Sequence, residues 1–226
     1  METLNNIVLT IQNYMSNYIL VIALLGAGLW FSIRLGFIQV RGFGESMRRT
    51  FGGLFSKKGA AGKDGMSSFQ ALATAIAAQV GTGNIAGAAT ALAIGGAGAI
   101  FWMWIAAFLG MATIYAEAIM AQKYKTVGAD GQVTGGPVYY IRAAFKGTFG
   151  KVLAGIFAVL ITLALGFMGN AVQSNSIAAA FHTAFGIPQW IMGLAVAVIA
   201  LFVFAGGIER IAKVTETVVP FMAALY

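Results

Sequence analysis

Long apolar stretches alternate with short basic ones along the whole chain. A helix needs about 20 mainly apolar residues to cross a hydrocarbon core about 30 Å thick. Apolar runs that predict helices cover about 14–33, 67–94, 98–122, 152–181, 188–207 and 211–226. Glycine and proline turns near 95–98 and 185–188 separate neighbouring runs. The last run is still apolar at Tyr226, so we expect this helix to be incomplete and the chain to be truncated within it.

The composition excludes several classes of protein. Hydrophobic residues make up 59% of the 226 residues and charged residues only 9%, whereas a soluble domain carries about 25% charged residues. A soluble enzyme or nucleic-acid-binding domain is therefore excluded. The chain has no Cys, and hence no disulfide framework or thiolate metal site. No Lys or Arg precedes the first apolar run, so we expect a true span there and not a secretory signal peptide.

The distribution of basic residues predicts the topology. All 14 Lys and Arg residues fall in segments 34–63, 123–151 and 210–213, while the N-terminus and the alternate turns have none. Because cytoplasmic loops carry the excess of Lys and Arg, these three segments are expected in the cytoplasm and the N-terminus outside. The net charge of +7 is thus a topology signal and does not indicate binding of nucleic acid.

The first basic segment, 36–63, interleaves aromatic and aliphatic residues with its charges. This pattern suits an amphipathic helix lying in the headgroup layer of the membrane. A hairpin facing the solvent would fit it equally well.

The second apolar run carries the candidate chemistry. Gly81 and Gly83 each destabilise a helix by about 1 kcal/mol relative to alanine, and Thr82 between them is a poor helix former. A run of this length has residues to spare for an unwound turn near 80–84. Such a turn would free carbonyl groups for a cation such as Na⁺ and amide groups for a carboxylate. Alternatively, Gly83 and Gly87 form a small-residue motif for helix packing.

Two further polar features lie within apolar runs. Five amide and hydroxyl residues cluster on the fourth run, where polar side chains are expensive unless they face protein or a cavity; they are Asn170, Gln173, Ser174, Asn175 and Ser176. They either line a site or form hydrogen bonds between helices. Glu117 is a functional candidate as an intramembrane acid, although an ion pair with Lys123 or a neighbouring basic residue, or snorkelling toward the membrane boundary, explains it more simply.

Four stretches of the chain are similar to signatures of the alanine/glycine:cation symporter family, also called the sodium:alanine symporters. They are QVGTGNIAG at 79–87, GGAGAIFWMW at 95–104, GGPVYYI at 135–141 and IAK at 211–213. The resemblance covers essentially the whole chain. It implies an all-α membrane protein with the leucine-transporter-type inverted-repeat fold. Residues 1–226 would be one partial transmembrane domain, with the first repeat preceded by an extra N-terminal helix.

The resemblance also implies residue roles. Thr82, Gly83 and Asn84 would bind the substrate carboxylate, and Gln173 would reach the bound amino acid. By similarity to the sodium sites of the fold, the carbonyls of Ala77 and Val80 would serve one Na⁺. Asn84 is a possible ligand of a second.

The function implied is Na⁺-coupled symport of small neutral amino acids, alanine or glycine, by alternating access across a prokaryotic inner membrane. Na⁺ is the coupling ion, no cofactor is expected, and the protein is not an enzyme. The expected partners are the amino acid, Na⁺ and the lipid bilayer, with no nucleic acid. Two alternatives stay open: a proton-coupled permease in which Glu117 titrates, and a membrane scaffold whose polar residues only hold helices together.

Overall fold

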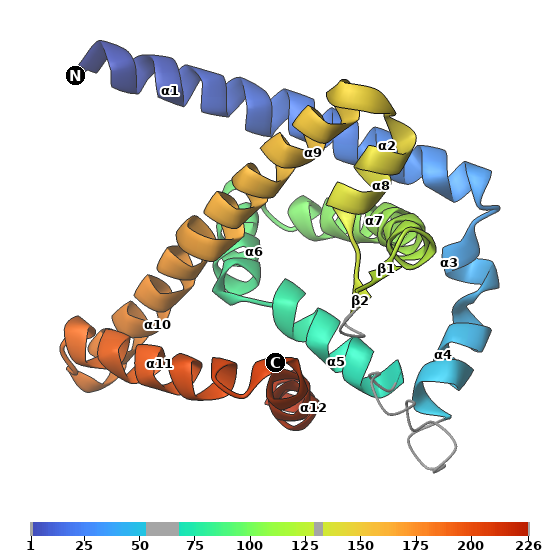
Figure 1. Ribbon diagram of the computed structural model, residues 1–226. Helices are drawn as coiled ribbons and strands as arrows, with labels where there is room; N and C mark the ends of the chain where they lie inside the picture. Colours follow the sequence, from blue (N-terminus) through green and yellow to red (C-terminus); the bar gives the residue numbers. More distant parts are fainter. Residues whose placement is uncertain (1, 53–67, 129–132, 226) are drawn as a thin grey trace. The chain divides into compact units, whose positions relative to one another are not determined.

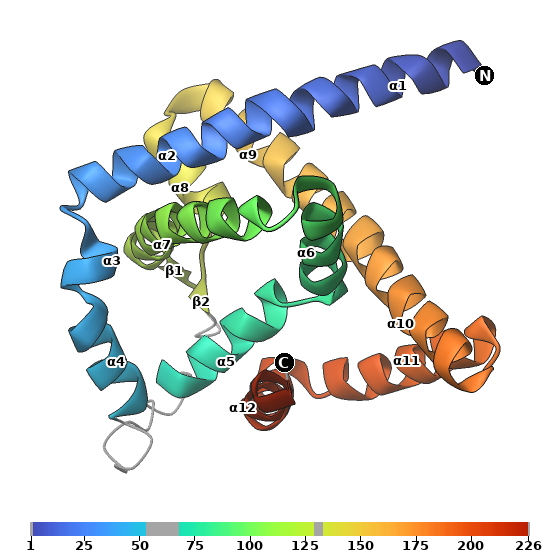
Figure 2. The same ribbon diagram turned by 180° about the vertical axis from the view of Figure 1, so that it is seen from behind.

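The computed structural model describes residues 2–52, 68–128 and 133–225 (Figure 1). It contains helices and one two-stranded hairpin, and divides into two compact units (Figure 2 gives the opposite view). The first unit comprises Met1–Phe43 and Gly95–Ala158, and the second Gly44–Ile94 and Val159–Tyr226.

The first unit begins with one continuous helix. It consists of α1 (Glu2–Tyr14), the π-helical segment η1 (Met15–Leu20) and α2 (Val21–Arg34). It starts at Glu2 and not at Tyr14, because the polar residues before Tyr14 interrupt the hydropathy of the chain without breaking the helix. The other helices are α3 (Ile38–Arg41), α7 (Gly98–Lys123), α8 (Pro137–Ala144) and most of α9 (Gly147–Ile161). Strands β1 (Thr126–Val127) and β2 (Val133–Thr134) pair antiparallel within the basic segment 123–151.

Small residues allow α2 and α7 to approach closely. A Cβ atom added to Gly28 would lie 2.8 Å from the Cβ of Leu109, so only glycine fits this contact. Ala112 is fully buried in the same helix pair. The hydroxyl of Ser32, also fully buried, donates to the Gly28 carbonyl at 2.7 Å and accepts from the Gln39 amide at 2.8 Å. Close backbone contact thus replaces bulky side chains in this core.

The second unit holds the remaining helices. They are α4 (Phe43–Phe51), which begins at the boundary between the units, α5 (Ser68–Gln79), α6 (Thr82–Gly95), α10 (Asn170–Phe185), α11 (Gln189–Phe204) and α12 (Gly207–Leu225). A π-helical segment, η3 (Thr162–Gly169), joins α9 (Gly147–Ile161) to α10 without a break. Helix α5 packs against α12, and α11 packs against α10 and α12. Ala73, Ala212 and Val219 are buried in this unit.

Three helices of the described residues are long and apolar enough to cross a membrane: Thr3–Arg34, Gly98–Lys123 and Gly147–Phe185. Helices α11 and α12 meet the same test only as a pair, bent by 118°. The second apolar run is divided into α5 and α6, of 12 and 14 residues, and neither half alone reaches the length of a span. The helical, apolar character supports the class of an all-α membrane protein.

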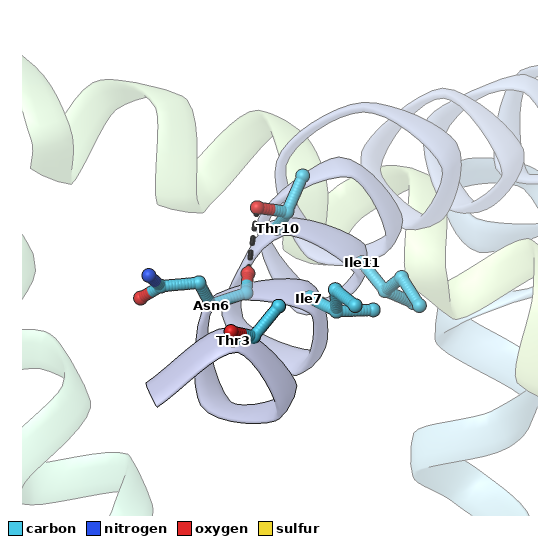
Figure 3. A pocket seen from close by; sticks show the side chains of 5 residues that line it. All are labelled: Thr3, Asn6, Ile7, Thr10 and Ile11. Atoms are coloured by element: carbon cyan, nitrogen blue, oxygen red, sulfur yellow. Dashed lines mark hydrogen bonds between the residues drawn. The ribbon is translucent and has the colours of Figure 1, made fainter. Parts of the chain in front are cut away.

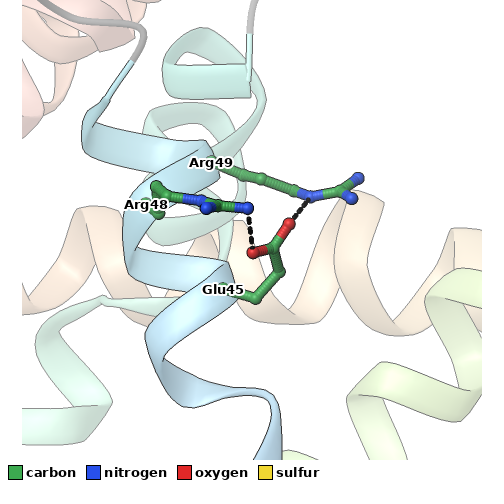
Figure 4. Close-up of polar contacts among 3 residues, drawn as sticks. All are labelled: Glu45, Arg48 and Arg49. Carbon is green, nitrogen blue, oxygen red and sulfur yellow. Dashed lines mark hydrogen bonds and ion pairs between the residues drawn. The ribbon is translucent and has the colours of Figure 1, made fainter.

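The described part of segment 36–63 is helical. Helix α4 separates an apolar side from a charged side, with Phe43, Met47 and Phe51 exposed one turn apart. On the charged side, Glu45 forms ion pairs with Arg48 at 2.5 Å and Arg49 at 2.6 Å (Figure 4). Of the two alternatives for this segment, residues 43–51 therefore form the amphipathic helix. Residues 53–67 lie outside the part of the chain that the structure describes.

Candidate functional site

The helical hydrogen-bond pattern is interrupted at Val80 and Gly81. The amide of Val80 still donates to the Ile76 carbonyl at 2.8 Å, as the last bond of the α5 pattern. On the other side, the amide of Asn84 donates to the Gly81 carbonyl at 3.0 Å, which closes the first turn of α6. Helix α5 therefore ends at Gln79 and α6 begins at Thr82, with two non-helical residues between them.

The break leaves backbone groups of opposite polarity unpaired. Among the described residues, the carbonyls of Ala77 and Val80 accept no backbone hydrogen bond, and the amides of Thr82 and Gly83 donate none. Carbonyl oxygens at a helix C-terminus carry partial negative charge, and amides at an N-terminus carry partial positive charge. The break can therefore attract a cation at one end and an anion at the other.

Two side chains at the break, those of Thr82 and Asn84, also offer polar atoms to a ligand. The side-chain amide of Asn84 donates from Nδ2 to the carbonyl of Gln79 at 3.2 Å, so its Oδ1 atom is left for another partner. The Oγ1 atom of Thr82 is buried and has no hydrogen-bond partner. Buried hydroxyl groups are normally hydrogen-bonded, so this atom is an unsatisfied group at the N-terminus of α6.

Gln173 on α10 lies directly against the break. A Cβ atom added to Gly81 would be 3.2 Å from both Cδ and Oε1 of Gln173, so glycine is what admits the amide at this distance. A pocket of about 360 Å³ opens between the break and the junction of η3 with α10. Its lining residues are Ala78, Gln79, Gly81, Thr82, Gly83, Asn84, Met168, Gly169, Val172 and Gln173.

The structure brings together four of the residues predicted from the sequence. Thr82, Gly83, Asn84 and Gln173 line the same pocket. Ala77 and Val80, the expected carbonyl ligands, belong to the break but do not line this pocket.

Most of the polar cluster on α10 serves its own helix. Asn170 donates to the carbonyl of Gly166, Ser174 to that of Ala171 and Ser176 to that of Val172. These three bonds fall within one helix, so they do not join α10 to another helix. Gln173 differs from them because its amide reaches α5–α6.

Sequence reasoning missed the polar contacts between α5 and α12. The Gln70 amide donates from Nε2 to Oε2 of Glu216 at 2.8 Å, and the hydroxyls of Thr74 and Thr215 lie 3.2 Å apart. Hydropathy alone places Glu216 within the apolar run 211–226. The signal available was an acid, flanked by threonines, three residues after Lys213.

The expected ion pair of Glu117 with Lys123 is not formed. The Lys123 ammonium group lies over the Tyr124 ring, 5.6 Å from its centroid. Across the described ranges, the ion pairs that form are those of Glu45. Glu117 instead acts on α8: burial and the Glu117 charge raise the pKa of the Tyr140 phenol.

A second hollow lies along α1 (Figure 3). Its lining residues, Thr3, Asn6, Ile7, Thr10 and Ile11, all come from this one helix. The Thr10 hydroxyl donates to the carbonyl of Asn6 at 2.7 Å, a bond internal to the helix. No second element of the described ranges provides a wall, so this hollow is the surface of a single helix.

A helix interrupted beside a polar pocket, in an otherwise apolar helical chain, is the arrangement found in secondary transporters of the membrane. The comparison with known families agrees with this class. The sodium:alanine symporter family model matches residues 1–226, and the chain belongs to this family.

Several curated relatives are similar over most of this chain. The sodium/alanine symporter AgcS of Methanococcus maripaludis is 43% identical over 98% of this chain and 48% of its own length. YrbD of Bacillus subtilis, named for a sodium/proton-dependent alanine carrier, is 47% identical over 90% of this chain and 40% of its own length. GlnT of Bacillus subtilis, whose name couples sodium to glutamine, is 41% identical over 100% of this chain and 45% of its own length. The chain spans about half the length of the curated relatives it matches.

Proposed function

We propose that this chain takes part in Na⁺-coupled symport of a small neutral amino acid, alanine or glycine, across a prokaryotic inner membrane. Inward flow of Na⁺ would drive uptake by alternating access. The proposed fold is the leucine-transporter-type inverted repeat, with the N-terminus outside and the basic segments cytoplasmic. The observation that carries the proposal is the pocket at the break, where Gln173 meets the N-terminus of α6.

The unpaired amides at the break suit the carboxylate of an amino acid, and the unpaired carbonyls suit its coupling ion. The amides of Thr82 and Gly83, with the unsatisfied Thr82 hydroxyl, would donate to the substrate carboxylate. The Gln173 amide, on the other side of the pocket, can both donate and accept. The carbonyls of Ala77 and Val80 would serve one Na⁺. Oδ1 of Asn84, whose Nδ2 is already engaged, would be the ligand of a second.

Proton coupling is the second candidate, and the name of YrbD favours it because it refers to protons as well as sodium. Glu117 would then be the titrating group. Na⁺-independent uptake that depends on a pH gradient, and is lost in Glu117→Gln, would support this candidate over Na⁺ symport.

The test is uptake by the protein as its gene encodes it, reconstituted in proteoliposomes. Labelled alanine, glycine, serine and glutamine are offered with and without an inward Na⁺ gradient. Gln173→Ala should weaken alanine binding by about 1–3 kcal/mol, because it leaves a polar group of the bound amino acid without its hydrogen-bond partner. Asn170→Ala is the matched control, since it removes an amide of the same helix that bonds only to its own backbone.

The outcomes are distinct. Uptake of alanine that needs the Na⁺ gradient, reduced by Gln173→Ala and not by Asn170→Ala, supports the proposal. Uptake that ignores Na⁺ contradicts the coupling ion. Equal affinity of Gln173→Ala and the unaltered protein, with correct folding, would make the amide structural.

A further inference from the structure

The contact between α5 and α12 contains a short ladder of polar bonds between otherwise apolar helix faces. Gln70 and Thr74, one turn apart on α5, meet Glu216 and Thr215, adjacent on α12. All four side chains are half-buried. Because the Thr215 hydroxyl donates to the Ala212 carbonyl at 2.9 Å, Thr74 is the donor in the bond between the threonines.

The Glu216 carboxylate accepts its hydrogen bond from a neutral side chain and not from a cation. Helix α5 carries no charged side chain, and neither does α11, the other helix packed on α12. The carboxylate therefore accepts from a neutral amide, Gln70. Buried Ala73, Ala212 and Val219 supply apolar contact in this unit, but such contact does not by itself fix how one helix is rotated against another. Directional hydrogen bonds do fix this rotation.

Helix α5 ends in the carbonyl groups of the break. From Thr74 to Val80 the helix rises about 9 Å, so a tilt of roughly 10° at the ladder would move the Val80 carbonyl by about 1.5 Å. Ion coordination tolerates deviations of only about 0.2 Å. The polar groups that dock α5 therefore decide whether its last carbonyls stand at ligand distance.

We propose that Gln70 and Glu216 are positioning residues for the Na⁺ ligands of the break, which they hold in place by docking α5 on α12. This inference rests on the proposed function, because it assumes that the carbonyls of Ala77 and Val80 bind the coupling ion. The amides at the start of α6 and Gln173 do not belong to α5. The ladder should thus act on the affinity for Na⁺ and leave that for alanine at saturating Na⁺ nearly unchanged.

The experiment measures the Na⁺ concentration for half-maximal alanine uptake, and the alanine KM at saturating Na⁺, for the protein as its gene encodes it in proteoliposomes. Gln70→Ala and Glu216→Ala should each raise the half-maximal Na⁺ concentration by about fivefold, the equivalent of losing one hydrogen bond. Adding Glu216→Ala to Gln70→Ala should cause no further shift, because the bond between Gln70 and Glu216 is already lost. Glu216→Gln keeps an acceptor for Gln70 and should restore the Na⁺ response.

Glu209→Ala is the matched control, because it removes an acid of the same helix that is exposed. It should leave the Na⁺ response unchanged. A shift in Glu216→Gln as large as in Glu216→Ala would overturn the inference, since charge and not the hydrogen bond would then matter. An unchanged Na⁺ response in the alanine variants, with only less folded protein, would overturn it also. If the unaltered protein needs no Na⁺, the proposed function fails instead, which is a separate result.

Discussion

Gly81→Ala tests the pocket with one added methyl group. The new Cβ would lie 3.2 Å from Cδ and Oε1 of Gln173 and 3.4 Å from Nε2. Ordinary van der Waals contacts begin at about 3.4 Å, so the amide must retreat by a few tenths of an ångström. The retreating group is the end of a flexible side chain, so we expect the fold to accommodate it.

The effect should appear in ligand affinity. A typical hydrogen bond contributes about 0.5–1.5 kcal/mol, and stretching the bond of Gln173 to the substrate forfeits part of it. We therefore expect alanine to bind roughly two- to fivefold more weakly in Gly81→Ala. The melting temperature should change much less, because no core contact is removed.

Isothermal titration calorimetry with alanine at saturating Na⁺ measures this difference. Gly87→Ala is the matched control: it adds the same methyl group on α6, where nothing lies within 4 Å of the new Cβ. Combining Gly81→Ala with Gln173→Ala completes a double-mutant cycle. If Gly81→Ala acts through Gln173, it has no further effect once this amide is gone.

Two results would refute the reasoning. One is an equal loss of affinity from Gly81→Ala whether or not Gln173 is present, which would place the cause elsewhere in the break. The other is an equal loss in Gly87→Ala, which would make helix propensity the cause.

Three further expectations follow from the break, the basic segments and α4. Gly83→Leu should abolish alanine uptake per folded molecule while expression survives, because its side chain fills space left for the ligand; near-normal Na⁺-dependent uptake would contradict the broken-helix site. Cysteine replacing Lys146 should resist an impermeant thiol reagent added outside intact cells, and cysteine replacing Thr3 should react; the reverse labelling would invert the topology. The hydrogen bond from Arg49, with the charges of both neighbouring arginines, lowers the pKa of Glu45 below 4.5. Its ion pairs should thus persist above pH 4.5 and be lost as the pH falls through the lowered pKa. A carbon-13 NMR titration should place the Glu45 midpoint below 4.5 and return it toward 4.5 in Arg49→Gln; equal midpoints would mean that the pair is absent in solution.

Some of the site could be predicted from local sequence. Glycines on either side of Thr82 weaken a helix wherever they occur, so a break there needs no tertiary information. The structure ends α5 at Gln79 and begins α6 at Thr82. The approach of Gln173 to Gly81 joins residues far apart in sequence, and hydropathy contains no signal for such a contact.

Other features could not be predicted, for identifiable reasons. Glu216 was hidden because averaging over an apolar run removes a single acid, and its partner Gln70 lies 146 residues away. The start of the first helix at Glu2 was missed because hydropathy measures membrane burial, whereas a helix can continue into a more polar segment.

The π-helical segment η3 sets the angular phase of everything that follows it on the same helix. Its eight residues, Thr162–Gly169, end directly before α10, and Met168 and Gly169 also line the pocket. A π-helical turn holds more residues than an α-helical turn, so it offsets the residues after it around the helix axis. Deleting one residue from η3 would turn α10 by about 100°. Gln173 would then point away from Gly81 although no residue of the pocket had been substituted. A single insertion or deletion in this apolar segment can therefore create or abolish the pocket. The number of residues in η3 matters more for the pocket than which apolar residues they are.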